Sequence, residues 1–99
     1  MDTGIDERTK RIIIGVISTL FPHARIILYG SRARGDHKER SDIDVAVDTG
    51  KKEERVNIGE ARDMINESNI HLKVEVVDFN NIPKEMQQNI ISDGILWKK

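Results

Sequence analysis

The chain has 99 residues, and its 16 basic and 17 acidic side chains give a formal net charge of −1. This length predicts a single domain, 1–99, because domains cluster near about 100–150 residues. The near-neutral charge argues against a dedicated nucleic-acid binder, which usually shows a basic excess. The absence of cysteine excludes disulfides, thiolate zinc sites and cysteine nucleophiles.

The beginning of the chain carries no targeting or membrane signal. Residues 1–4 are polar, unlike a signal peptide, and no apolar run approaches the roughly 18 residues of a membrane span. We therefore expect a cytoplasmic protein with no membrane partner.

The first half of the chain predicts a helix followed by a strand. Residues 5–20 are expected to form an amphipathic helix that Thr3 caps and Pro22 ends. Its apolar positions recur at helical spacing: Ile13, Val16, Ile17 and Leu20. Residues 24–29 are a β-branched run that ends at Gly30, which is typical of a buried strand.

After a charged stretch, 32–40, which we expect to be a loop or short helix, residues 42–48 alternate with period two. One face carries Ile43, Val45 and Val47, and the other carries Asp42, Asp44, Ala46 and Asp48. Residues 54–68 predict a second helix. One of its faces carries Ala61, Met64 and Ile65.

The end of the chain predicts a strand at 72–79, a short helix from Pro83 to about Ser92, and a short edge strand at 95–97. Gly94 ends the helix. Helices and strands in this order indicate an α/β (α+β) domain with a small mixed sheet of three to four strands and helices packed on it.

A glycine-serine pair stands where the first strand ends. Gly30 would let backbone amides approach an anion closely, and Ser31 adds a hydroxyl. Arg32 and Arg34, which follow, could contact phosphates or the edge of the sheet. The alternative for this segment taken alone is an ordinary turn.

Asp42 and Asp44 are two positions apart on a predicted strand. Their side chains therefore point to the same face, with Cα atoms about 6.5 Å apart. Both can reach hard cations such as Mg²⁺, which prefers oxygen ligands. The alternative is a solvated strand face, but aspartate is disfavoured in strands, and two like charges on one face repel unless a cation neutralises them.

Glu75 lies inside an apolar run and would complete a three-carboxylate cluster if its strand neighbours that of Asp44. Asp78, three positions further on, lies on the opposite face and is interpreted as a strand-end residue, as is Asp48. The three histidines follow no ligand spacing, and Tyr29 and Trp97 are interpreted as packing residues.

Together, Gly30-Ser31, the ten residues that follow and Asp42-x-Asp44 resemble the signature of the DNA polymerase β-like nucleotidyltransferase superfamily. The short chain, its segment 74–78 and its ending 82–96 are similar to the minimal nucleotidyltransferase (MNT) group. Members of that group often have aspartate where this chain has Glu75. Glutamate also ligates Mg²⁺, so we interpret the site as intact and expect the extra methylene to shift its geometry and slow turnover.

The resemblance implies transfer of a nucleoside monophosphate, AMP from ATP, to an acceptor hydroxyl. Two Mg²⁺ ions would be held by Asp42, Asp44 and Glu75, while Gly30 and Ser31 cradle phosphates. It also implies that the chain is an antitoxin whose acceptor is a tyrosine of a helical HEPN toxin. Two alternatives remain: a binding module that neutralises its partner by association, and transfer to a small molecule or RNA.

Overall fold

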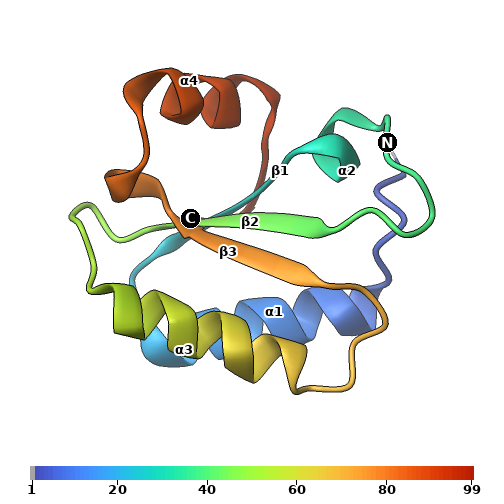
Figure 1. Ribbon diagram of the computed structural model, residues 1–99, viewed down its shortest axis with the longest axis horizontal. Coiled ribbons are helices and arrows are strands. Elements are labelled where there is room, and N and C mark those ends of the chain that lie inside the picture. Colours follow the sequence, from blue (N-terminus) through green and yellow to red (C-terminus); the bar gives the residue numbers. More distant parts are fainter. Residues whose placement is uncertain (1) are drawn as a thin grey trace.

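The computed structural model describes residues 2–99, in which helices and strands alternate around one four-stranded sheet (Figure 1). In chain order the elements are α1 (Glu7–Leu20), β1 (Arg25–Tyr29), α2 (Ser31–Arg34), β2 (Ile43–Asp48), α3 (Arg55–Asn66), β3 (Val74–Asp78), a 3-10 turn η1 (Phe79–Asn81), α4 (Lys84–Asp93) and β4 (Ile95–Lys98). The predicted mixed α/β class is confirmed, including the short final strand. Within the described residues, no helix is long and apolar enough to cross a membrane.

The sheet has the strand order β3-β2-β1-β4 and mixes both directions of pairing. β1 is antiparallel to β2 and to β4, whereas β2 and β3 are parallel. A parallel pair needs a crossover connection, and α3 supplies it across one face of the sheet (Figure 1). Consequently β2, which contains Asp44 and begins one residue after Asp42, lies between β1 and β3.

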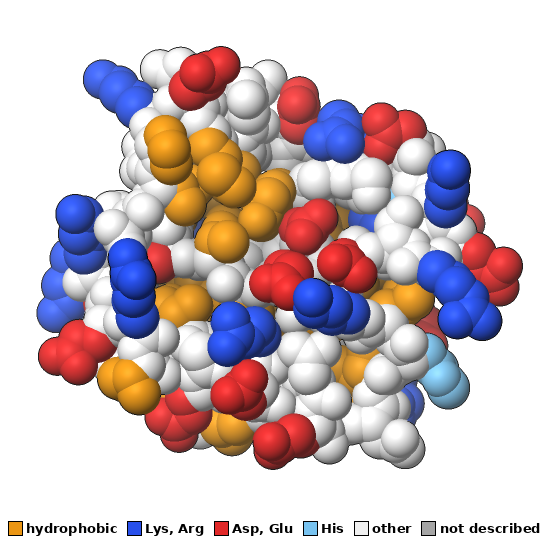
Figure 2. Space-filling model, in the orientation of Figure 1, with side chains coloured by type: hydrophobic (Ala, Val, Ile, Leu, Met, Phe, Trp, Pro, Cys, Tyr) orange, Lys and Arg blue, Asp and Glu red, His pale blue; other side chains and the backbone are white. Residues whose placement is uncertain are grey.

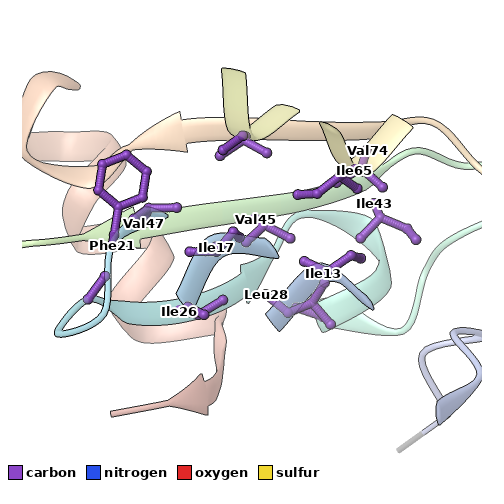
Figure 3. Close-up of a cluster of buried hydrophobic side chains, with 14 residues drawn as sticks. Ile13, Ile17, Phe21, Ile26, Leu28, Ile43, Val45, Val47, Ile65 and Val74 are labelled. Carbon is purple, nitrogen blue, oxygen red and sulfur yellow. The ribbon is translucent and has the colours of Figure 1, made fainter. Parts of the chain in front are cut away.

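The main core fills the space between the sheet and the helices α1 and α3 (Figure 3). Ile13 and Ile17 of α1 and Ile65 of α3 are completely buried there. Each such side chain contributes about 1.5–3 kcal/mol when it is removed from water. The sheet contributes alternate residues of its strands: Ile26, Leu28, Ile43, Val45, Val47, Val74 and Val76. The predicted alternation of β2 is therefore confirmed.

The opposite face of the sheet is covered by α4, together with Phe79 of η1 (Figure 1). Ile90 of α4 packs there in a smaller cluster with Ile27, Ala46 and Phe79. At the end of this face nearest Tyr29, the side chains of Tyr29, Asp44 and Glu75 are only partly buried. This end contains the candidate site.

Three details of the helices differ from the sequence-based predictions. The cap of α1 is Asp6, whose Oδ1 accepts from Thr9 N at 2.7 Å, and not Thr3. Met64 is 38% exposed, because it lies beside the buried stripe of α3 and not in it. Pro83 precedes the first residue of α4 and acts as its N-cap residue.

Candidate functional site

Three polar side chains form a row across the sheet on the face that α4 covers. The strand register pairs Tyr29 of β1 with Asp44 of β2, and pairs Asp44 with Glu75 of β3. Neighbouring strands lie about 4.8 Å apart, and paired residues point to the same face. The two carboxylates are therefore direct neighbours, as expected if the predicted strands pair. The next row is apolar and consists of Ile27, Ala46 and Val77.

Gly30 directly follows β1 and lies against Asp44. Its φ of 77° and ψ of −158° belong to a backbone region that is essentially restricted to glycine. A Cβ at this position would collide with the Asp44 carboxylate and come within 3.2 Å of its Cγ. The missing side chain thus allows the turn and the carboxylate to approach each other closely.

Ser31 opens α2, a single turn that closes back on the glycine-serine pair. The backbone N–H of Arg34 donates to the Gly30 carbonyl at 3.1 Å, and that of Gly35 donates to the Ser31 carbonyl at 2.9 Å. Gly35 ends the turn with a left-handed φ of 85°. The 30–35 segment is therefore a closed turn held at the end of the carboxylate row.

Asp42 and Lys73 flank the row. Asp42 is exposed just before β2 begins, and its charge acts on Asp44. Lys73 Nζ forms an ion pair with Glu75 Oε1 at 2.9 Å. The hydrogen bond to Glu75, and then the charges of Glu75 and Asp42, raise the pKa of Lys73. Lys73 was not among the residues predicted for the site; its position two residues before Glu75 was the available signal in the sequence.

The electrostatics of the row disfavour negative charge. Burial, and then the charges of Asp42 and Glu75, raise the pKa of Asp44, while Arg34 opposes the shift. Burial, followed by the charges of Asp44 and Glu75, raises the pKa of Tyr29 to about 12. The phenol of Tyr29 therefore stays protonated beside the carboxylates, so this residue belongs to the surroundings of the site as well as to the packing that the sequence predicted.

This donor set suits a divalent cation that shares its coordination with a phosphate ligand. Among residues 2–99, no three His, Cys, Asp or Glu side chains are grouped so as to hold a metal by themselves. Mg²⁺, however, is usually bound through one or two carboxylates together with substrate phosphates, and Asp44 and Glu75 offer such a pair. A bound cation would also relieve the repulsion that raises the pKa of Asp44.

Arg32 does not face this site, which corrects the expectation that it contacts phosphates. Its side chain is only 1% exposed, and all three guanidinium nitrogens donate to backbone carbonyls. Arg34 is exposed, and its charge acts on Asp44. Of the two arginines, Arg34 is therefore the one that can meet an anion at this site.

Two further acidic residues are structural, as the sequence indicated. Asp48 pairs with Arg25 at 2.6 Å and accepts from Asn80 Nδ2 at 2.8 Å. Asp78 is buried; it accepts from Asn80 N at 3.0 Å and from Glu53 N at 2.7 Å. Both carboxylates are occupied by these bonds at the far end of the sheet.

The surroundings of the row are partly apolar. Figure 2 shows acidic side chains gathered over β2 and β3, with hydrophobic side chains beside them below α4. The partly buried hydrophobic residues on this side are Tyr29, Val77, Ile82 and Met86. A niche of about 70 Å³ beside Gly30 and Arg34 is lined by α4 residues, among them Asn89 and Asp93. This niche is too small to enclose a nucleotide, so a nucleotide at this site would lie largely on an open surface.

Comparison with known proteins agrees with this architecture. The glycine-serine turn lies against Asp44, which is in register with Glu75 on the neighbouring strand of a small mixed sheet. The sequence profile of "Polymerase beta, Nucleotidyltransferase" matches residues 13–98. The chain therefore belongs to the polymerase β nucleotidyltransferase family.

Several solved structures have the same fold. A toxin–antitoxin structure with AMP-PNP is similar with a TM-score of 0.78 and 23% identity, over 91% of this chain and 73% of that one. A tri-AMPylated HEPN toxin of Shewanella oneidensis in complex with MNT antitoxin gives 0.75 and 20%, over 96% and 74%. The toxin–antitoxin pair MntA-HepT gives 0.74 and 20%, over 95% and 74%. A search of curated proteins found no match.

Proposed function

We propose that this chain is a Mg²⁺-dependent nucleotidyltransferase that moves AMP from ATP to a hydroxyl of a partner protein. The observation that carries the proposal is the close approach of Gly30 to Asp44, with Glu75 in register beside it. Family membership supports the general reaction. Our proposal adds to this the roles of the residues, the identity of the nucleotide and the identity of the acceptor.

The proposed roles follow from position. Asp42, Asp44 and Glu75 would hold two Mg²⁺ ions, and the glycine-serine turn with Gly30 and Ser31 would receive the β- and γ-phosphates. When bound, the ions would neutralise phosphate charge and stabilise the attacking and leaving oxygens of an in-line displacement. The carboxylates would fix where the positive charge of the ions lies, and the protein contributes mainly positioning and electrostatics.

The proposed transfer exchanges one phosphorus–oxygen bond for another. The acceptor hydroxyl oxygen bonds to the α-phosphorus, the bond from that phosphorus to the α–β bridging oxygen breaks, and pyrophosphate leaves. The hydroxyl proton passes to Glu75 or to solvent. Lys73 pairs with Oε1 of Glu75 at 2.9 Å, so its positive charge would compete with a metal ion for this carboxylate, whose second oxygen lies outside the pair.

The acceptor proposed is a tyrosine of a helical HEPN-type toxin, which would make the chain an antitoxin. The similar structures are toxin–antitoxin complexes, one with AMP-PNP and one with an AMPylated HEPN toxin. The small niche beside Gly30 also favours an acceptor surface that a second molecule supplies. Because ATP is abundant in the cytoplasm, we place the reaction there.

The alternative is a binding module that silences its partner by association with little catalysis. The ion pair between Lys73 and Glu75 is the observation that favours it, since the pair places a competing positive charge beside the third carboxylate. Lys73→Met separates the two possibilities. Under the catalytic proposal this variant transfers label at least as fast as the wild type, because Glu75 is released for metal.

The test is label transfer from ATP labelled in the α-phosphate, with Mg²⁺, to the protein encoded by the neighbouring gene. Label on that protein with the wild type and none with Asp44→Asn supports the proposal. Asp63→Asn is the matched control, because Asp63 is an exposed carboxylate of α3, which covers the other face of the sheet. A stable complex that never acquires label supports the binding module.

A further inference from the structure

The side chain of Arg32 is a buried cation without an acidic partner. It is 1% exposed and is among the largest completely buried side chains. Within residues 2–99, it takes part in none of the ion pairs. A buried charge is costly unless hydrogen bonds satisfy it. The hydrogen bonds of Arg32 must therefore hold this cation in the folded protein.

The guanidinium joins three segments of the chain. Nε donates to the Ser41 carbonyl at 3.0 Å, and Nη1 donates to the Thr3 carbonyl at 2.9 Å. Nη2 donates to the Glu39 carbonyl at 3.0 Å and, more weakly, to the Lys38 carbonyl at 3.4 Å. The planar fork of arginine supplies donors in these fixed directions, which a lysine cannot do.

These bonds connect the two halves of the candidate site. Arg32 follows Ser31 in α2, so its backbone belongs to the turn proposed to bind phosphate. Ser41, on the other side, immediately precedes Asp42. The segment between them is itself a turn, in which Lys38 N donates to Ser41 Oγ at 2.8 Å and Ser41 N donates to the Lys38 carbonyl at 3.1 Å.

The N-terminal segment closes over the guanidinium. Gly4 has a φ of +69°, and a Cβ there would lie 2.7 Å from Arg32 Nη1 and 2.9 Å from His37 Nε2. The chain therefore passes so close to the arginine that a side chain at position 4 would displace it. The cation is held from three sides.

We infer that Arg32 is a positioning residue for the metal and nucleotide site. Its guanidinium fixes the 38–41 turn relative to the glycine-serine turn, and so holds Asp42 beside Asp44. This inference rests on the proposed function, because it assumes that these carboxylates bind a metal–nucleotide complex. Arg32 touches neither ligand; it acts through Ser41 and Asp42.

The test compares Arg32→Lys with Arg40→Lys, which makes the same change at an exposed arginine of the same segment. Two quantities are measured on folded protein: amide hydrogen exchange in residues 36–42, and the affinity for Mn²⁺ with ATP by electron paramagnetic resonance. We expect Arg32→Lys to speed exchange in this segment and to weaken Mn²⁺–ATP binding about tenfold, because one ammonium cannot replace the fork. Arg40→Lys should match the wild type.

Ser41→Ala tests the same turn without disturbing the buried charge, should Arg32→Lys fail to fold. Loss of the bond from Lys38 N should weaken Mn²⁺–ATP binding in the same direction, by about threefold. Ile17→Val, a core change on the other face of the sheet, controls for lower stability alone and should leave the affinity unchanged.

Wild-type Mn²⁺–ATP affinity in folded Arg32→Lys, or in Ser41→Ala if the first variant does not fold, would overturn the inference. If the wild type itself binds no Mn²⁺–ATP, the proposed function fails. The exchange data then decide whether Arg32 holds the 38–41 turn in place. Faster exchange of residues 36–42 in Arg32→Lys alone then supports the conclusion that Arg32 fixes the 38–41 turn. Equal exchange in both arginine variants refutes that conclusion.

Discussion

Replacing Gly30 with alanine perturbs the point where the turn meets the carboxylate row. The backbone there has φ 77° and ψ −158°, and a Cβ would strike the Asp44 carboxylate. A non-glycine residue in such a region costs about 1–3 kcal/mol. Since a loss of 1 kcal/mol lowers the Tm of a domain of this size by about 4–8 °C, a cost near 2 kcal/mol should lower the Tm by about 8–16 °C.

A second glycine provides the matched control. Gly15 lies in the interior of α1, where an added Cβ would meet nothing within 4 Å. Alanine there removes the entropic penalty of a helical glycine, so Gly15→Ala should raise stability by about 0.5–1 kcal/mol. Thermal and urea unfolding followed by circular dichroism measure both variants. If both substitutions change the Tm in the same direction, or if Gly30→Ala has the Tm of the wild type, then Gly30 is not held in strained contact with Asp44.

Three further variants test the electrostatics and the sheet edge. Asp44→Asn should have a free energy of unfolding at pH 7 at least as large as that of the wild type. The folded state holds the Asp44 proton more tightly than the unfolded state does. Ionisation of Asp44 therefore costs stability as the pH rises above the ordinary aspartate pKa of 3.8. This advantage should vanish below pH 3.8, and urea titrations at both pH values check it. Asp48→Asn should do the reverse. Although burial alone would raise the pKa of Asp48, hydrogen bonds from Arg25 and Asn80 lower it, so the variant is less stable at pH 7 and the deficit closes as pH falls through that lowered pKa; a deficit that persists in acid would contradict this. Asn66→Ala should cost about 1–3 kcal/mol in urea unfolding, because Asn66 pairs with both the N–H and the carbonyl of Val74 at the edge of β3, whereas Asn57→Ala, at an exposed position of the same helix, should cost far less.

Much of the site could be predicted because its signals are local. The alternation of 42–48 places Asp44 on the polar face, and the glycine directly after a strand marks the turn. Glu75 stands out as a carboxylate between the apolar residues Val74 and Val76. Pairing of its strand with β2, which the sequence left conditional, brings Glu75 into register with Asp44.

The parts that could not be predicted depend on contacts between distant residues. An arginine beside a glycine-serine turn suggests a phosphate ligand, but Arg32 bonds to Thr3, 29 residues earlier in the chain, and is buried. Thr3 is a good capping residue by type, yet Asp6 is closer to the helix and caps it. Burial and competition between neighbours decide both cases, and neither is visible in local composition.

Transfer of a nucleoside monophosphate by the carboxylate row and the glycine-serine turn is what we propose for this chain. The most direct measurement is a parallel reaction with ATP labelled in the α-phosphate and ATP labelled in the γ-phosphate, each with Mg²⁺ and the protein encoded by the neighbouring gene. We expect only the α-label to appear on that protein, the γ-label to appear in pyrophosphate, and Asp44→Asn to abolish both. A partner that acquires the γ-label, or that is bound without acquiring any label, would contradict it.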